Sequence, residues 1–316
     1  MDLLVTGTPG PLLGWTCELV RAVSMSMHDS VELVEPGADE AWAPRTGPNA
    51  RLVVAGYLGA AHEAAVRDGL LRAVVVVDDA QTSLAALRGS GQSLTEALRN
   101  LTACVTPLGR LAGGRHVATV TRDGAAPQAV TRALLEGCRW ATDGGQIAAL
   151  AARIESAWPP PTEAAPEETK LVEQVLEPAF RFAATGNRGM VIWPRACLMW
   201  GDRPGEPAPR VLDLTGPSRV LAYGPYFRLA PGRWTARVML AFSPSCRKAP
   251  LAIEMHGSAL FARRRFQVPR AGMFWAAVPF DVPSAREAIE LRLVSERGAI
   301  EGTLGIDHVV LTPDTD

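Results

Sequence analysis

A short apolar stretch near the N-terminus runs directly into a turn that is rich in glycine and proline. Residues 2–6 predict a short buried strand, residues 7–11 form the turn, and Gly14 opens a predicted helix. Strand, glycine-rich turn and helix N-terminus together form the place where α/β proteins hold phosphate, because free backbone N–H groups and the helix dipole point there. The residues that supply this frame are Thr6, Gly7, Thr8, Gly10 and Gly14.

The frame lacks the cations that normally hold a phosphate group. The phosphate-loop pattern G-x-x-x-x-G-K-[ST] is absent, because Gly7 and Gly14 are spaced too widely and no lysine follows. Lys170 and Lys248 are the only lysines in the sequence, so none precedes residue 170. We therefore expect a degenerate phosphate-loop region, and we assign it no catalytic residue, no cofactor and no metal.

A second polar segment follows the strongest predicted strand, residues 73–77, whose unbroken β-branched run is typical of a buried parallel strand. Asp78 and Asp79 leave this strand, and Ser83 lies in the helix that follows. In parallel sheets the carboxyl ends of neighbouring strands meet at one edge, where ligands are held. We therefore add Asp78 and Ser83 to the degenerate phosphate-loop region.

The two segments together resemble the sulfotransferase family, over roughly residues 1–157. That family carries a strand-turn-helix of the form T-G-x-P-R-S-G-T, and a later strand ending in R-D-P with a serine a few residues on. Both motifs contact the phosphates of the sulfonate donor. Thr6-Gly7-Thr8-Pro9 matches the start of the first motif, and Asp79 and Ser83 match parts of the second.

The sequence departs from both motifs at the charged positions. Residues 10–13 stand where the family has Arg-Ser-Gly-Thr, while Asp78 replaces the second arginine and Ala80 the proline. A carboxylate in place of an arginine repels phosphate, at a cost on the order of several kcal/mol in a half-buried cleft. The resemblance therefore implies a domain that has lost its enzymatic activity. An active transferase remains the alternative if other arginines hold the phosphate, namely Arg45, Arg51, Arg88, Arg110 or Arg122.

Aromatic and planar polar residues gather in the second half of the chain. Sugar binding uses aromatic faces for the C–H side of a pyranose and planar polar groups for its hydroxyls. The string from Tyr223 to Trp234, with the strands after it, resembles β-sandwich modules attached to bacterial enzymes of cell-surface polysaccharide assembly. Those modules are similar to carbohydrate-binding domains, and the resemblance covers about residues 210–313. The candidate ligand-binding residues are Tyr223, Tyr226, Arg228 and Trp275.

Each of these aromatic residues also has a structural interpretation. Trp234 leads the inward face of its strand and is expected in the core, whereas Trp275 lies on the opposite face from Phe274. Tyr223 and Tyr226 would brace a corner through their hydroxyl groups. The basic stripe at residues 263–265 fits either an acidic polysaccharide or partner, or a solvated sheet face.

The elements that position these residues predict two fold classes, α/β and then all-β. Strands at 2–6, 31–34, 51–57, 73–77 and 116–120 alternate with helices from 14, 59–69, 83–87, 93–111, 127–140 and 145–158. That order predicts a mostly parallel sheet flanked by helices over residues 1–157.

The rest of the chain predicts a linker and a second fold. Residues 158–209 have three prolines near their start and predict a linker with one helix, 170–184, interrupted at Pro178. Residues 210–316 alternate with period two and predict a jelly-roll-type β-sandwich of about eight strands.

Composition limits the setting. The net charge of −1 gives no indication of nucleic acid or an anionic membrane. Five scattered cysteines without C-x-x-C spacing favour buried thiols over disulfides or zinc. No apolar run approaches the roughly 20 residues of a membrane span, and we expect a cytoplasmic protein. His62 and Glu63 could form an acid–base pair, without a third metal ligand.

The sequence thus predicts a non-catalytic carbohydrate-binding or assembly protein of bacterial exopolysaccharide or cell-surface polysaccharide biosynthesis. Its expected partner is a glycan or a polysaccharide-synthesis protein, and a homo-oligomer is left open. Two alternatives remain: an active nucleotide-dependent transferase acting on a glycan, and a structural protein–protein interaction module.

Overall fold

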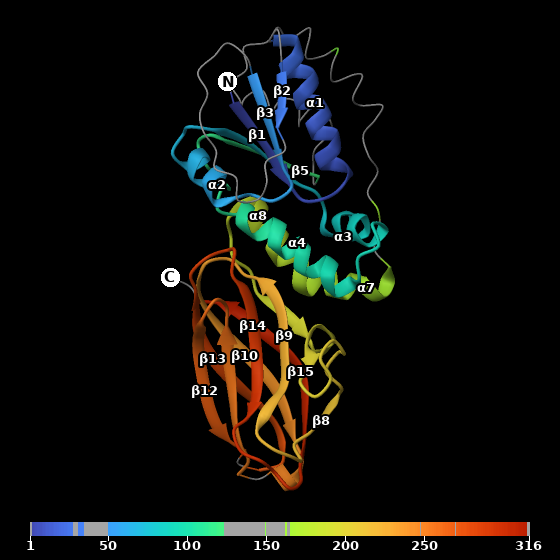
Figure 1. The fold of residues 1–316 in the computed structure, drawn as a ribbon, viewed down its shortest axis with the longest axis vertical. Helices are drawn as coiled ribbons and strands as arrows, with labels where there is room; N and C mark the ends of the chain where they lie inside the picture. The colour runs from blue at the N-terminus through green and yellow to red at the C-terminus, as the bar shows by residue number, and fades with distance from the viewer. Residues whose placement is uncertain are drawn as a thin grey trace. The chain divides into compact units, whose positions relative to one another are not determined.

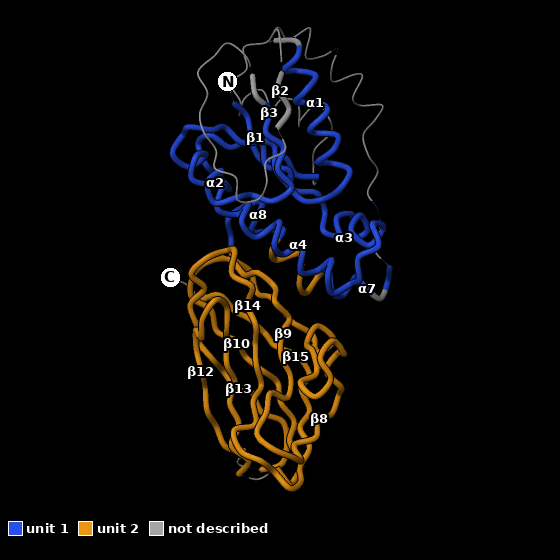
Figure 2. The backbone as a smooth tube through the Cα atoms, in the orientation of Figure 1, with its two compact units in different colours: residues 1–172, 180–187 blue, residues 173–179, 188–316 orange. Residues whose placement is uncertain are grey.

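The computed structural model describes residues 2–27, 31–34, 50–122, 149, 162, 165–246, 248–268 and 270–314. The chain divides into two compact units (Figures 1 and 2). Unit 1 comprises residues 1–172 and 180–187, and unit 2 comprises residues 173–179 and 188–316. The predicted helices at 127–140 and 145–158 lie outside the described residues, apart from the single helical residue Ala149.

Unit 1 is built on a parallel sheet, here called sheet A, as the alternation of strands and helices predicts. Its strand order is β2-β3-β1-β4-β5, and every neighbouring pair is parallel. The strands are β1 (Asp2–Gly7), β2 (Val31–Val34), β3 (Ala50–Ala55), β4 (Arg72–Val77) and β5 (Val117–Thr121). Residues 73–77 of β4 are all buried, which agrees with an apolar strand covered on both faces.

Helices accompany the strands of sheet A (Figure 1). They are α1 (Pro11–Met27), α2 (Ala60–Arg67), α3 (Ala80–Gly89) and α4 (Leu94–Leu108). The first places Leu12, Trp15 and Leu19 on one face by helical spacing, and these pack in one core cluster with Val74 and Val76 of β4. The last begins with the predicted capping box, in which Ser93 and Glu96 each bond the other's backbone N–H.

The predicted helix at 170–184 is part of one longer helical stretch. It runs as α7 (Pro166–Leu171), a π-helical turn (Val172–Leu176) and α8 (Glu177–Thr185). Pro178 has no N–H to offer the carbonyl four residues earlier, and the wider π turn lies just before it. The proline is therefore accommodated inside the helical stretch and does not end it.

Unit 2 consists of two five-stranded antiparallel sheets, consistent with the predicted β-sandwich. Sheet B has the order β13-β10-β15-β6, with β8 also paired to β15, and sheet C has the order β12-β11-β14-β9-β7. The strands are β6 (Val191–Pro194), β7 (Met199–Trp200), β8 (Val211–Asp213), β9 (Arg219–Arg228), β10 (Gly232–Phe242), β11 (Pro250–His256), β12 (Leu260–Gln267), β13 (Gly272–Val282), β14 (Ala288–Ser295) and β15 (Thr303–Pro313). Short 3-10 helices span Arg195–Cys197 and Pro244–Cys246.

The period-two pattern correctly identifies the core face of the sandwich. Trp234, Ala236, Val238, Leu240 and Phe242 are buried, and the residues between them are more exposed. The Trp234 indole N–H donates to the Ala230 carbonyl at 2.8 Å, so its polar atom is satisfied inside. Among the described residues after 210 there are eight strands, β8 to β15, while a jelly-roll connectivity stays a prediction.

The division of the chain differs from the predicted boundaries at residues 157 and 210. Two strands of unit 2, β6 and β7, lie within residues 158–209, where a linker was expected. The first pairs with β15 and the second with β9, so both are parts of the sandwich. They are only four and two residues long, too short for a period-two pattern to be recognised.

Three further findings concern the described residues. Cys104, Cys197 and Cys246 are buried thiols and Cys17 is half-buried, none of them in a disulfide, while Cys138 lies outside the described ranges. In the part of the chain that the structure describes, no helix has the length and apolar character to cross a membrane. Within the same ranges, no cluster of three or more His, Cys, Asp or Glu residues could hold a metal ion.

Candidate functional site

The predicted phosphate-loop region lies at the topological switch point of sheet A. Residues 8–10 connect β1 to α1, and Asp78 and Asp79 connect β4 to α3. The chain leaves β1 toward β2 on one side of the sheet and leaves β4 toward β5 on the other. Crevices at such points are where open α/β sheets hold their ligands. We call residues 7–12 the anion turn.

A carboxylate of the protein itself occupies the anion turn. The backbone N–H of Leu12, in the first turn of α1, donates to Asp78 Oδ2 at 3.2 Å, and the N–H of Asp79 donates to Oδ1 at 2.9 Å. The backbone N–H of Asp78 donates in turn to Thr8 Oγ1 at 2.9 Å. A free N–H at a helix N-terminus, which would favour a ligand anion, therefore binds a side chain instead.

Glycine is required at two positions of the anion turn, Gly10 and Gly7. A Cβ atom on Gly10 would lie 2.9 Å from Asp78 Oδ2, so only glycine lets the turn come this close. A Cβ atom on Gly7 would overlap the carbonyl oxygen of Val76 in β4, so Gly7 is required by strand packing. Gly14 has no neighbouring atom within 4 Å of its Cβ position, and nothing in the structure requires glycine there.

Arg122, which directly follows β5, pairs with the buried carboxylate. Its Nε donates to Asp78 Oδ1 and its Nη2 to Asp78 Oδ2 at 3.1 Å, while Nε also lies 3.1 Å from Asp79 Oδ2. The Asp78 side chain is fully buried and that of Arg122 is 9% exposed. The hydrogen bonds with Asp78, more than the charges of the two aspartates, raise the pKa of the Arg122 guanidinium. One cation faces two carboxylates, which gives a local charge of −1 and opposes a further anion.

The anion turn therefore contains a cation, but one that an internal partner has already engaged. Among the phosphate-ligand candidates whose side chains the structure describes, Arg88, Arg110 and Arg122, it is Arg122 that pairs with Asp78 at the turn. Arg110 pairs with Glu63 at 2.7 Å and Arg88 with Glu168 at 3.2 Å. Arg45 and the side chain of Arg51 lie outside the described residues. Glu63 is thus engaged by an arginine in addition to any relation with His62.

Two buried hydroxyl groups complete the region. Thr6 Oγ1 and Ser83 Oγ are fully buried and have no hydrogen-bond partner among the described residues. Ser83 Oγ lies 3.8 Å from the position that a Gly10 Cβ would take, so it is directed at the anion turn. Asp79, its neighbour in the family motif, caps α3 by accepting from the Thr82 N–H at 2.6 Å.

A different type of site lies on the outer face of sheet B. Met239 of β10 is paired with Trp275 of β13, and Ala241 with Met273. The Trp275 side chain is on this outer face, as the alternation predicted, and the residue is 43% exposed. Beside it is a hollow of about 660 Å³, here called the sheet B groove. Among its lining residues are Arg210, Val211, Met239, Met273, Thr303 and Asp307.

Planar polar groups surround the exposed indole. The guanidinium carbon of Arg237 lies 5.3 Å from the centre of the Trp275 ring, and the imidazole of His308 meets it edge-on at 5.4 Å. His308 Nδ1 lies 2.6 Å from an oxygen of Asp307, which lines the groove. An aromatic face beside carboxylate and guanidinium groups is the combination that sugar rings require.

The other predicted ligand-binding residues do not join Trp275. Tyr223, Tyr226 and Arg228 belong to β9 in sheet C, and Trp275 belongs to sheet B. The Tyr226 hydroxyl donates to Glu290 Oε1 at 2.8 Å, and Glu290 pairs with Arg292 at 2.8 Å. Burial, then the hydrogen bond and charge of Glu290, raises the pKa of Tyr226 to about 12. This agrees with the bracing role considered for the tyrosines, since the hydroxyl of Tyr226 is engaged inside unit 2.

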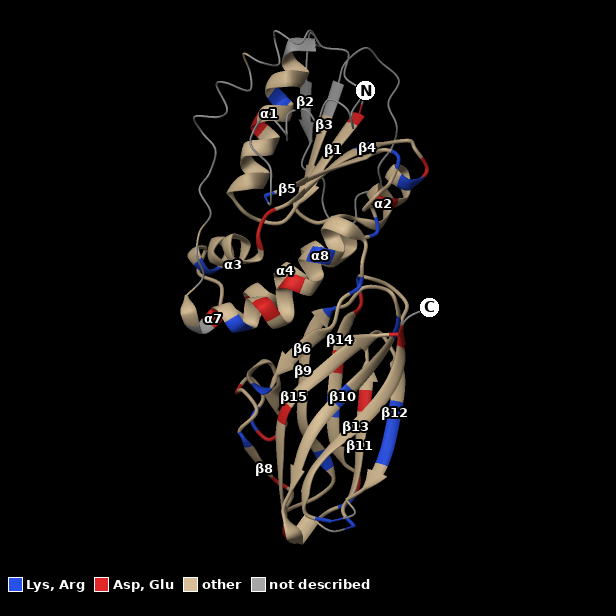
Figure 3. Ribbon diagram, turned by 180° about the vertical axis from the view of Figure 1, so that it is seen from behind, with Lys and Arg blue, Asp and Glu red and all other residues tan. Residues whose placement is uncertain are grey.

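Several groove residues were not predicted as site residues. Met239, Met273 and Asp307 of the groove, and Arg237 beside Trp275, were not singled out, although the alternation that places Trp275 outside also places Met273 there. The basic stripe on β12 is visible in Figure 3. Two of its arginines, Arg263 and Arg265, pair with Glu296 at 2.6 and 2.7 Å, and the pairs lower the pKa of that carboxyl group.

Comparisons with known proteins give partial similarities of fold. No protein-family model matches the chain, and no curated protein matches its sequence. Similar solved structures include a family 16 carbohydrate-binding module, with 10% identity, a TM-score of 0.24, and coverage of 31% of this chain and 72% of that one. A sugar-binding protein, the EclA C-terminal domain, has 15% identity and a TM-score of 0.27, covering 33% and 77%. A mouse sulfotransferase complexed with PAP has 10% identity and a TM-score of 0.36, covering 50% and 66%.

Proposed function

We propose that this protein is a non-catalytic carbohydrate-binding protein, in which unit 2 holds a glycan in the sheet B groove. One observation carries the proposal: the exposed Trp275 is paired with Met239, and Met239 lines a 660 Å³ hollow that polar groups border. A hollow of this size falls within the range of about 300–1,000 Å³ that small-molecule sites occupy.

The groove offers a sugar both kinds of contact that it needs. The side chains of Met239 and Met273 line an apolar floor, and the indole of Trp275, paired with Met239, extends the apolar surface offered to the C–H face of a pyranose ring. Asp307 accepts hydrogen bonds from hydroxyl groups, and Arg210 donates them. The carboxylate of Asp307 is exposed and lines the groove, so it is the main candidate for selecting the sugar.

The anion turn supports a non-catalytic role for unit 1. Its helix N-terminus and its arginine are both engaged by Asp78, so a phosphorylated donor would have to displace a buried ion pair. The sequence resemblance to modules of bacterial surface-polysaccharide assembly supplies the context of the proposal. The partner would then be an exopolysaccharide or cell-surface polysaccharide, or a protein that makes one.

A glycan array probed with the full chain tests the proposal. Wild type should bind a defined set of glycans, and Trp275→Ala should weaken that binding at least about tenfold, since loss of an aromatic anchor costs about 2 kcal/mol or more. Trp200→Ala is the matched control. Trp200 lies in sheet C, and the guanidinium carbon of Arg203 lies 4.8 Å from the centre of its ring. Equal loss in both variants, or no glycan bound by wild type, would contradict the proposal.

A nucleotide-dependent transferase acting on a glycan is the second candidate. The observation in its favour is the pair of buried hydroxyls, Thr6 and Ser83, that have no partner among the described residues. Buried polar groups normally have hydrogen-bond partners, and a bound oxyanion would supply one. Specific binding of adenosine 3′,5′-bisphosphate would favour this candidate over the first.

A structural interaction module is the third candidate. Met273 and Val211, both at the sheet B groove, are 74% and 57% exposed. Exposed apolar side chains that cluster on one face often mark contact with another protein. This candidate predicts that the chain binds no glycan on the array.

A further inference from the structure

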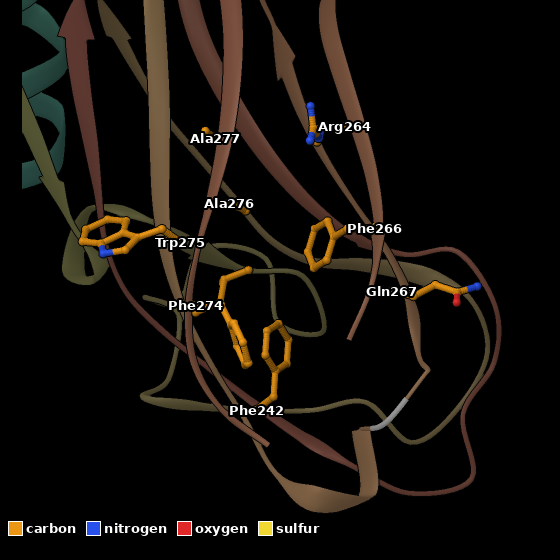
Figure 4. Close-up of a pocket in the computed structure, with 9 residues that line it drawn as sticks. Phe242, Arg264, Phe266, Gln267, Phe274, Trp275, Ala276 and Ala277 are labelled. Carbon is orange, nitrogen blue, oxygen red and sulfur yellow. The ribbon is translucent and has the colours of Figure 1, made fainter. Parts of the chain in front are cut away.

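A second hollow in unit 2 lies where the edges of the two sheets meet. Three phenylalanine side chains form its walls, and we call it the phenylalanine cleft (Figure 4). The ring of Phe242 lies 6.5 Å from that of Phe266 and 6.1 Å from that of Phe274, measured between ring centres. The cleft has a volume of about 220 Å³. Trp275 borders it, but its indole points away from the three rings.

The cleft exists because β12 and β13 are edge strands with a small residue at a key position. The strand β12 ends sheet C and β13 ends sheet B. Phe274 and Ala276 share the core face of β13 with the buried Val278. Because Ala276 carries only a methyl group, the space between the two edges stays unfilled, and both Phe266 and Phe274 remain half-buried.

A guanidinium that has no ion-pair partner among the described residues lies beside this apolar space. Arg264 is opposite the fully buried Ile253 of β11, and so it lies on the inner face of β12 together with Phe266. Its neighbours Arg263 and Arg265 lie on the other face and pair with Glu296. Arg264, which also lines the cleft, forms no ion pair within the described part of the chain.

We propose that the phenylalanine cleft binds a small amphipathic carboxylate. An aromatic ring or short alkyl chain lies among Phe242, Phe266 and Phe274, and the guanidinium of Arg264 holds the carboxylate. A dry cavity of about 150 Å³ accepts benzene, so 220 Å³ suits one ring with a short chain. Ring pairs at 4.5–7 Å between centres are favourable, at about 0.5–1.5 kcal/mol beyond burial of area. The planar fork of arginine matches a carboxylate with two parallel hydrogen bonds.

Phe242 lines both hollows, but the polar groups differ: Arg264 lines the phenylalanine cleft and Asp307 the sheet B groove. The cleft opens between the sheets, whereas the sheet B groove lies on an outer face. Ligand binding in one can therefore be present when the other fails. The alternative is a purely structural role for Arg264, because an inward-pointing charge on an edge strand prevents pairing with the edge of another sheet.

Titration of the full chain with 4-phenylbutyrate, followed by ligand-observed NMR, tests the assignment. The neutral analogue 4-phenylbutanol has the same ring and chain, and it should bind at least about tenfold more weakly because it forms no charge-assisted hydrogen bond. Arg264→Gln should reduce 4-phenylbutyrate binding to the level of the alcohol. Arg265→Gln is the matched control and should leave binding unchanged, since Arg265 is paired on the other face.

A cleft-filling variant tests the apolar part. Ala276→Leu places a larger side chain among the three rings, so it should abolish binding while the unfolding temperature stays at least as high as in wild type. Three results would overturn the assignment: equal binding of acid and alcohol; equal loss in Arg264→Gln and Arg265→Gln; and no binding of 4-phenylbutyrate at all. Aggregation of Arg264→Gln with unchanged ligand binding would assign the arginine to edge protection instead. Self-association of wild type that Ala276→Leu removes would assign the cleft to a second copy of the chain.

Discussion

At the scale of single residues, the chain places its own carboxylate at the helix N-terminus of a switch-point turn, where open α/β sheets hold a ligand anion. Asp78 accepts from the N-terminal turn of α1 and pairs with Arg122, which also approaches Asp79. A carboxylate at this position was expected to repel an anion from an otherwise open turn. The structure adds that the carboxylate also occupies the turn and engages its cation, which is a stronger barrier than repulsion alone.

Removing the charge of Asp78 should destabilise unit 1 and open the turn to external anions. In Asp78→Asn the buried guanidinium of Arg122 loses the charge of its closest described partner, so we expect a loss of about 3 kcal/mol in the free energy of unfolding. Sulfate should then raise the unfolding temperature of the variant more than that of wild type, because the ion restores a partner at the turn. Thermal unfolding with and without sodium sulfate measures both effects.

Glu63→Gln is the control for this comparison. Glu63 also forms an ion pair in unit 1, with Arg110 at 2.7 Å, and neither residue belongs to the anion turn or to the pair of Asp78 and Arg122. Sulfate should therefore affect this variant no more than it affects wild type. If sulfate stabilises Asp78→Asn and Glu63→Gln to the same degree, the turn has no special affinity for the ion.

Tyr226 gives a second residue-scale prediction, on pH dependence. Its pKa rises from 10.0 to about 12, first through burial and then through Glu290. Because the folded-state pKa is the higher one, the neutral hydroxyl contributes stability that is fully present below pH 10.0 and is lost as pH rises toward 12. Ultraviolet absorbance of tyrosinate should show a late step that Tyr226→Phe removes and Tyr223→Phe retains. A late step that survives in Tyr226→Phe would contradict the assignment.

At the scale of elements, local pattern predicted what has a local cause. The apolar run of β4, the capping box at Ser93 and the alternation along β10 each depend on residues close in sequence, and each is found in the structure. The strands β6 and β7 were missed, because they are short and are stabilised by β15 and β9 far along the chain. The pairing of Asp78 with Arg122 spans 44 residues and depends on β4 and β5 being neighbours, which no local pattern shows.

The same distinction between local and long-range causes applies to the candidate site. Exposure of Trp275 could be predicted from the period of β13, and the position of Asp78 from the end of β4. The separation of Trp275 from Tyr223, Tyr226 and Arg228 could not be predicted, because it depends on which sheet each strand joins. Strands that follow one another along the chain often belong to different sheets of a sandwich.

Two glycines at the start of the chain should respond to alanine in opposite ways. In Gly7→Ala the new Cβ meets the Val76 carbonyl and side chain, so β1 and β4 cannot keep their register, and unfolding should become easier by about 2 kcal/mol or more. In Gly14→Ala the Cβ meets nothing within 4 Å, and removal of a glycine from α1 should stabilise by about 0.5–1 kcal/mol. Urea unfolding of the two variants measures the difference. A stable Gly7→Ala would disprove the close approach of the two strands.

At the scale of the whole molecule, two units with different sheets contribute different properties. Unit 1 has a parallel sheet with a switch-point turn, and Asp78 occupies the helix N-terminus at that turn. Unit 2 has a groove on sheet B next to the exposed Trp275, and an apolar cleft at its sheet edges. We therefore expect recognition to belong to unit 2, and donor binding to be lost from unit 1.

Isothermal titration calorimetry of the full chain with adenosine 3′,5′-bisphosphate tests this division most directly. The nucleotide carries the phosphate groups that an open anion turn would hold at the first turn of α1. Because Asp78 and Arg122 satisfy each other there, wild type should give no saturable heat. A saturable heat with micromolar or tighter affinity would contradict the account, since the turn would then be a working nucleotide site.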